Sequence, residues 1–89
     1  MVIDYGLKIW RDSGQFIAHA LPLDVASSGE TQAAARAAVD EAVRLFVKTA
    51  ADQGTLMEML EDVGYRFDGS RWASPERIGN ETHSTTAIV

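Results

Sequence analysis

The chain has 89 residues, of which 46% are hydrophobic and 24% charged, and this composition is that of one small folded domain rather than a disordered segment. It has no cysteine, which excludes disulfides and thiolate metal sites and fits the reducing cytoplasm, and no apolar run reaches the ~18 residues of a membrane span. The net charge of −5 opposes unaided binding to nucleic acid. It would favour a basic protein partner, although it also serves solubility alone.

The N-terminal residues predict a β-hairpin. In Ile3–Ile9 apolar side chains alternate with polar residues or glycine, which is the period of a half-buried strand. Asp12-Ser13-Gly14 interrupts this pattern, and a three-residue loop that ends in glycine is a common hairpin connection because its last position favours a positive φ. Gln15–Leu21 is therefore expected to return antiparallel to the first strand, with Arg11 opposite Gln15.

This register decides which side chains share a face of the hairpin. It brings Trp10, Phe16 and Ala18 together on the sheet face that we assign away from the long helix. An aromatic pair on that face needs a cover, and a partner chain is one candidate. The C-terminal tail or a second hairpin over Tyr65–Trp72 is the other.

The middle of the chain predicts one long helix. Pro22 cannot donate to a β-ladder and marks a bend, after which Asp24–Ser27 is expected to form a short third strand. Glu30 and Thr31 offer an N-cap, and Gly54 is placed to end the helix as its C′ residue. The apolar stripe expected to pack on the sheet consists of Val39, Ala42, Val43, Phe46, Val47 and Ala50.

Shorter elements follow the long helix. Thr55 and Glu58 have the spacing of a capping box, which predicts a second, short helix that ends at Gly64. Asp68-Gly69 is a two-residue type I′ turn signal, and it predicts a small hairpin with Tyr65 opposite Trp72. Trp72 is expected either to seal the end of the sheet or to anchor an interface between chains.

The last part of the chain is polar. We expect residues 1–73 to form the domain and residues 74–89 to form a mobile C-terminal tail, with an edge strand near the C-terminus as the alternative.

Catalytic chemistry finds little support in the sequence. Asp4 lies on the first strand, where a nuclease of the RNase H type would carry a metal-binding carboxylate, yet no matching set of carboxylates can be picked out. The other acids fall on helix faces typical of solvated positions. His19 and His83 lack the spacing of a metal site or of a base beside a nucleophile, and His19 is expected to be a packed strand residue with one hydrogen bond. We therefore expect no enzyme activity, no metal and no cofactor.

Four segments, taken in order, resemble the HicB-like antitoxin family. In that family a glycine–aromatic–apolar strand runs into a proline-containing bend, and a similar turn opens the main helix. The matching segments are Gly14-Gln15-Phe16-Ile17-Ala18, Ala20-Leu21-Pro22-Leu23-Asp24, Ser28-Gly29-Glu30-Thr31 and the alanine-rich helix through Phe46. The likeness spans roughly Ile3 to Tyr65, and Leu23-Asp24 stands where family members commonly carry Pro-Gly.

The resemblance implies a fold and a role. The implied fold is α+β of the partial RNase H type, in the order β-β-β-α-(α)-β, with an antiparallel sheet and one long helix packed on one face. Characterised members are usually oligomeric and neutralise HicA-like toxins, which cleave messenger RNA, by covering them. Complete members add a C-terminal DNA-binding module. Because the residues after Gly64 show no helical periodicity, DNA binding is not carried over to this chain.

These observations lead to one expected function and two alternatives. The chain is expected to be an antitoxin-like cytoplasmic module that forms a homodimer or a higher homo-oligomer and masks a small basic HicA-like toxin. Its expected protein interface comprises Trp10, Phe16, Ala18 and Trp72, with no direct contact to nucleic acid or membrane. The alternatives are an orphan homo-oligomeric scaffold protein without a toxin partner and a relic of a metal-dependent nuclease.

Overall fold

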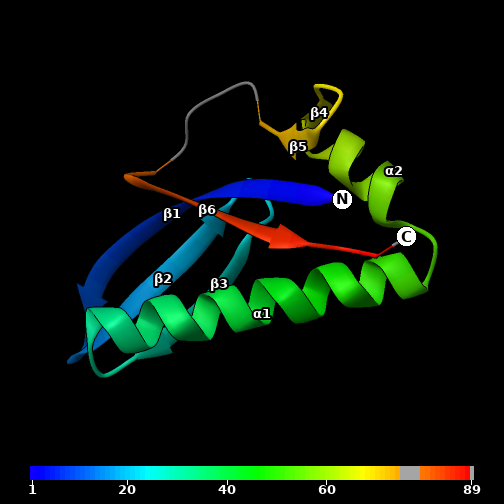
Figure 1. Ribbon diagram of the computed structural model, residues 1–89. Helices are drawn as coiled ribbons and strands as arrows, with labels where there is room; N and C mark the ends of the chain where they lie inside the picture. The colour runs from blue at the N-terminus through cyan, green and yellow to red at the C-terminus, as the bar shows by residue number, and fades with distance from the viewer. Residues whose placement is uncertain (75–78, 89) are drawn as a thin grey trace.

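A mixed β-sheet with one long helix across one face makes up the fold (Figure 1). The computed structural model describes residues 1–74 and 79–88. The α+β class is confirmed for these residues, but the expectation of a purely antiparallel sheet is wrong, because one strand pairs parallel with the first. The elements are β1 (Val2–Asp12), β2 (Gln15–Leu21), β3 (Val25–Gly29), α1 (Gln32–Asp52), α2 (Leu56–Asp62), β4 (Arg66–Phe67), β5 (Arg71–Ala73) and β6 (Glu81–Thr86).

β1 is the central strand, and it is paired along both edges. On one edge it pairs antiparallel with β2, and β3 lies beyond β2. On the other edge, residues 2–7 of β1 pair antiparallel with β6. β5 pairs parallel with Val2 and Ile3, and since β6 already occupies one side of these residues, β5 must share the edge of β2. The first strand is thus enclosed by segments from distant parts of the chain.

The first hairpin has a shorter turn than predicted. Asp12 pairs with Gln15, so the turn consists of Ser13 and Gly14, whose φ angles are 51° and 82°. Positive φ at both central residues defines the type I′ turn, whose twist matches that of the two strands. The predicted register, with Arg11 opposite Gln15, is therefore wrong by one residue. A slip of one residue moves every side chain of β2 to the opposite face.

α1 begins and ends where the sequence predicts. The Thr31 hydroxyl accepts a hydrogen bond from Ala34 N (3.0 Å), and Gly54 follows the helix with a φ of 74°. Phe46, from the predicted stripe, lies at the flank of the packed face and is 38% exposed. Burial of a valine is worth ~1.5–3 kcal/mol, so the packed stripe contributes much of the fold's stability. The buried residues of α1 are Ala35, Val39, Val43, Val47 and Ala50.

Gly29 allows the start of α1 to lie against the end of β3. The strand begins one residue later than predicted and extends past Ser27 to Gly29. A Cβ at this position would lie 2.6 Å from Ala35 N and 2.8 Å from the Ala34 carbonyl carbon. Both atoms belong to the helix backbone and cannot rotate away. Glycine therefore sets how closely the helix crosses the sheet.

α2 forms where expected but without its predicted cap. Thr55 makes no side-chain hydrogen bond to the helix start, so the capping-box prediction is wrong. Leu56 and Leu60 are buried and anchor the helix by their apolar contacts. Within the described residues, neither α1 nor α2 combines the length and the apolar character needed to cross a membrane.

The second hairpin turns one residue later than predicted. The Asp68 carboxylate accepts hydrogen bonds from Ser70 N (2.9 Å) and Arg71 N (3.0 Å), which favours a turn centred on residues 69 and 70. Trp72 consequently pairs with Phe67. The expected pairing of Trp72 with Tyr65 is wrong.

Residues 81–86 are a strand and not the mobile tail that we expected to start at residue 74. They form β6, so the alternative of an edge strand near the C-terminus describes this segment. β1 offers unpaired backbone groups along this edge, and the threonines of β6 have the β-branched side chains that favour strands. β6 belongs to the same sheet as residues 1–73. Residues 75–78 and 89 of the predicted tail lie outside the described residues.

Candidate functional site

The structure separates the four residues predicted for an interface. Trp10 lies on the sheet face away from α1, and 44% of its surface is exposed. Because of the changed register, Ala18 and Phe16 face the helix instead. Ala18 is fully buried, and Phe16 is partly buried against the core. Trp72 is 6% exposed and packs against Phe67, with 5.5 Å between ring centroids. Of the four, Trp10 alone presents a large accessible surface.

Trp10 belongs to an open patch on β1 and β2. Ile17 lies directly opposite it, and the His19 ring is 6.2 Å from the indole at an angle of 71°. Leu21 continues the same face of β2, and we call Trp10, Ile17, His19 and Leu21 the Trp10 patch. His19 Nε2 contacts one Asp24 oxygen at 2.6 Å, which confirms the one hydrogen bond expected of it, but the ring lies on the outer face of the sheet with 26% of its side chain exposed. In Figure 1, α1 crosses the opposite face, so no described helix covers the patch.

A chain of hydrogen bonds joins β1, α1 and β6. The Tyr5 hydroxyl donates to Asp40 Oδ1 (2.7 Å), and His83 Nδ1 lies 2.9 Å from the same oxygen. His83 Nε2 is 3.1 Å from Glu81 Oε1. The Glu81 carboxylate also accepts a bidentate pair of hydrogen bonds from Arg36 Nε (3.0 Å) and Nη2 (2.8 Å). We call these five residues the Asp40–His83 network.

The charges in this network support one another. Burial, together with the hydrogen bond to Asp40, raises the pKa of Tyr5 well above its usual value, so the hydroxyl stays protonated and donates. Hydrogen bonds from Arg36 and then from His83 lower the pKa of Glu81, which keeps its carboxylate charged. Carboxylates only accept hydrogen bonds, so the His83 ring satisfies both neighbours as a donor when both of its nitrogens carry protons.

The network ties β6 to α1 and lacks the shape of a metal site. The His83 ring lies between the carboxylates of Asp40 and Glu81, so these groups do not converge on one point. Within residues 1–74 and 79–88, no group of three or more His, Cys, Asp or Glu is arranged to hold a metal ion. Asp4, the carboxylate considered for a nuclease, is paired with Arg71 at 2.9 Å.

Sequence reasoning missed this network because its members are far apart in the chain. Tyr5 and Asp40 are 35 residues apart, and Arg36 and Glu81 are 45 apart. The sequence places His83 in the segment that we expect to be a mobile tail. One sequence pattern could have indicated the strand: Glu81 and His83 alternate with small polar residues. This period of two is typical of a strand that turns one face toward a partner.

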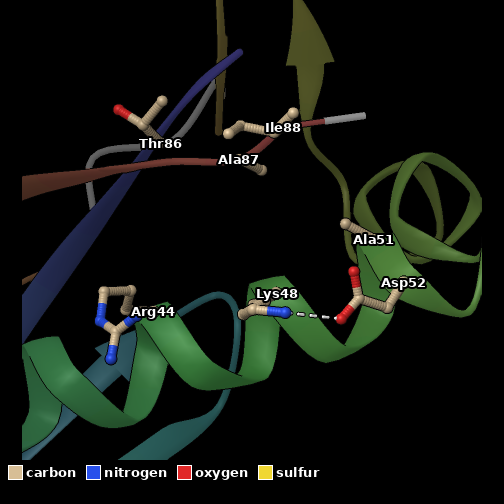
Figure 2. Close-up of a pocket in the computed structure, with 7 residues that line it drawn as sticks. All are labelled: Arg44, Lys48, Ala51, Asp52, Thr86, Ala87 and Ile88. Atoms are coloured by element: carbon tan, nitrogen blue, oxygen red, sulfur yellow. Dashed lines mark hydrogen bonds and ion pairs between the residues drawn. The ribbon is translucent and has the colours of Figure 1, made fainter.

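A groove lies between the second half of α1 and the chain that follows β6 (Figure 2). Its volume is about 380 Å³. The cations of the helix already have partners, since Lys48 contacts Asp52 at 2.8 Å and Arg44 contacts Glu41 at 2.6 Å. Ile88 is 94% exposed at the opposite wall. The lining residues are Arg44, Lys48, Ala51, Asp52, Thr86, Ala87 and Ile88.

Three features of the described residues therefore invite a functional explanation: the Trp10 patch, the Asp40–His83 network, and the groove beside β6. No protein-family model, curated protein or solved structure matches this chain. Its function has to be argued from its own residues and surfaces.

Proposed function

We propose that the protein is an antitoxin-like protein-binding module of the cytoplasm, which neutralises a small basic HicA-like toxin that cleaves messenger RNA. The observation that carries this proposal is the exposed Trp10 on the sheet face that no described helix covers. Tryptophan is among the residues that contribute most energy when buried between two chains. The module would act by masking the toxin and would carry no catalytic groups of its own.

The size of the Trp10 surface supports a binding role. An exposed fraction of 44% of an indole side chain corresponds to roughly 100 Å², and covering it at ~25 cal/mol per Å² is worth ~2–3 kcal/mol. Ile17 and Leu21 extend the apolar surface along β2. One aromatic anchor with apolar neighbours is the usual centre of a protein interface.

The distribution of charge supports a basic partner. α2 carries Glu58, Glu61 and Asp62 on its exposed side, and within the described residues none of them forms an ion pair, in contrast to the acids of α1 that pair with neighbouring cations. The net charge of −5 adds to this field. Such a field accelerates association with a basic protein and repels phosphate backbones, so we propose a protein partner and no direct contact with nucleic acid.

The general architecture is compatible with the likeness to HicB-like proteins. A hairpin-led sheet with α1 across one face is what a partial RNase H domain requires, and we propose this more specific fold. The parallel pairing of β5 and the antiparallel pairing of β6 on β1 are additions to the expected pattern.

Co-expression with any small basic reading frame found beside the gene tests the proposal. The tagged protein is expected to co-purify with the toxin and to suppress its messenger-RNA cleavage. Trp10→Ala is expected to weaken the complex by about 30-fold, from the lost ~2 kcal/mol of covered indole. Leu45→Ala is the matched control, because Leu45 is 49% exposed on the other layer of the fold and should leave affinity unchanged. If no neighbouring product co-purifies, or if Trp10→Ala binds as the wild type does, the proposal is wrong.

A second candidate is an orphan homo-oligomeric scaffold without a toxin partner. The observation in its favour is the outer edge of β6, which pairs with no strand among the described residues. This candidate predicts a stable homo-oligomer and no heteromeric complex. No feature of the described residues favours the nuclease relic.

A further inference from the structure

Along its outer edge, β6 presents backbone hydrogen-bonding groups that pair with no other described strand. Met1 N donates to Ala87 O (2.8 Å), and Ala87 N donates to Met1 O (2.9 Å), so these two residues form a hydrogen-bonded pair of the β1–β6 ladder. Antiparallel ladders alternate between hydrogen-bonded and non-hydrogen-bonded pairs. Every second residue back from Ala87 therefore faces β1, and the backbone groups of Thr82, Ser84 and Thr86 point away from it. Within the described residues, nothing accepts or donates to them on that side.

We infer that this edge is the interface of a homodimer, in which β6 pairs antiparallel with β6 of a second copy. The pairing continues the sheet across a two-fold axis and places both α1 helices on the same face. It satisfies the outward N–H and C=O groups of β6. Unpaired groups of this kind are the usual liability of an exposed edge strand. This inference concerns the protein alone and is independent of any toxin.

The positions of the outward groups select one register. Pairing centred on Ser84 places Ser84 opposite Ser84 of the second copy, and Thr82 opposite Thr86, so all three outward residues form hydrogen-bonded pairs. Shifting the centre to His83 or Thr85 leaves at least one of these residues without its counterpart within β6. The Ser84-centred register is therefore the one that uses the whole edge.

The side chains in this register are compatible with a second copy. On the outer face, Thr and Ser side chains oppose one another, and such pairs stabilise antiparallel strands. On the helix face, His83 lies opposite Thr85, and Glu81 of the second copy lies opposite Ala87. Ala87 lines the groove beside α1 (Figure 2), where Glu81 and the cations Arg44 and Lys48 each keep an ion-pair partner within their own chain. No two like charges are placed opposite each other.

The outward-pairing residues of β6 carry none of the devices that keep strand edges apart. Natural edge strands are blocked by lysine, by proline, by bulges or by charges that point inward. The residues of β6 that pair outward are Thr82, Ser84 and Thr86, and all three are small, uncharged and exposed. Glu81, whose side chain points toward α1, is paired with Arg36 within the chain. A self-complementary edge of this kind fits a second copy of the same strand.

Sedimentation or light scattering on the purified protein tests the inference. The wild type is expected to have about twice the monomer mass of 9.7 kDa at high micromolar concentration. Ser84→Lys places two like charges opposite each other at the centre of the β6–β6 interface and should raise the dimer dissociation constant several-fold. Ser84→Pro removes the central N–H donors of both chains and should raise it about tenfold or more. Neither change breaks a hydrogen bond within the chain, and circular dichroism verifies folding.

Two further samples make the test specific. Thr82→Lys adds the same charge on the same face but places it opposite Thr86 rather than opposite another lysine, so this variant should weaken the dimer less than Ser84→Lys does. Ser84→Lys mixed with Ser84→Glu should regain the dimer, because opposite charges then meet at the centre. A wild type that remains a monomer overturns the inference and leaves the edge to a strand of another protein. Equal dimerisation of Ser84→Lys, Thr82→Lys and wild type also overturns it.

Discussion

Replacing Tyr5 by Phe removes one hydroxyl from the Asp40–His83 network and preserves the packing of the ring. Tyr5 is 3% exposed, and its hydroxyl donates to a carboxylate at 2.7 Å. A hydrogen bond to a charged group contributes ~1.5–3 kcal/mol. The Asp40 side chain is 40% exposed and keeps its contact with His83, so water replaces part of the loss. We therefore expect a destabilisation of ~1.5 kcal/mol, which lowers Tm by about 6–12 °C in a domain of this size.

Urea unfolding followed by tryptophan fluorescence and far-ultraviolet circular dichroism measures this loss. The midpoint should fall while the m value stays constant, because the same surface is exposed on unfolding. A double-mutant cycle with Asp40→Ala isolates the pair: in that background Tyr5→Phe should cost close to nothing. A Tyr5→Phe chain within ~0.5 kcal/mol of the wild type, or an equal cost in the Asp40→Ala background, would refute the reasoning.

Two other positions give predictions about the fold. Gly29→Ala should destabilise the protein by ~1–3 kcal/mol, because the new methyl group overlaps the α1 backbone. The control Ser28→Ala, on the exposed face, should change stability by less than ~0.5 kcal/mol. Equal midpoints of the two variants in thermal unfolding would contradict this. The pKa of Glu81 is lowered by Arg36, so its contribution is present above the unfolded value of about 4.3 and is lost as pH falls below it. The Tm of Glu81→Gln should therefore fall less than that of the wild type when the pH is lowered from 6 to about 3. Plots of Tm against pH that run parallel for the two proteins would count against the Glu81–Arg36 pairing.

The elements that the sequence predicted well are those with local determinants. The periodicity of α1 and the residues at its two ends, Thr31 and Gly54, lie within the helix or next to it. Helical spacing and capping act over three or four residues, so they can be recognised without knowledge of the fold. The existence of the first hairpin was predicted for the same reason.

The parts that sequence reasoning missed depend on tertiary structure. Ser13 adopts a positive φ that only a few per cent of non-glycine residues take, and this one residue changed the register and moved Phe16 and Ala18 to the helix face. β6 is polar on both faces, so it lacks the apolar alternation that marks a strand, and its partner β1 lies at the other end of the sequence. Trp10 was correctly placed on the face away from α1, although two of its predicted neighbours were not.

The position of β1 between β2 and β6 has a consequence for the order of events during synthesis. The edge of Val2–Leu7 that receives β6 stays vacant until residues 81–86 have left the ribosome. β2 and β3 can join β1 much earlier, because they follow it directly in the chain. The contact between β1 and β6 that completes this part of the sheet is one of high sequence separation, which is the kind that slows folding.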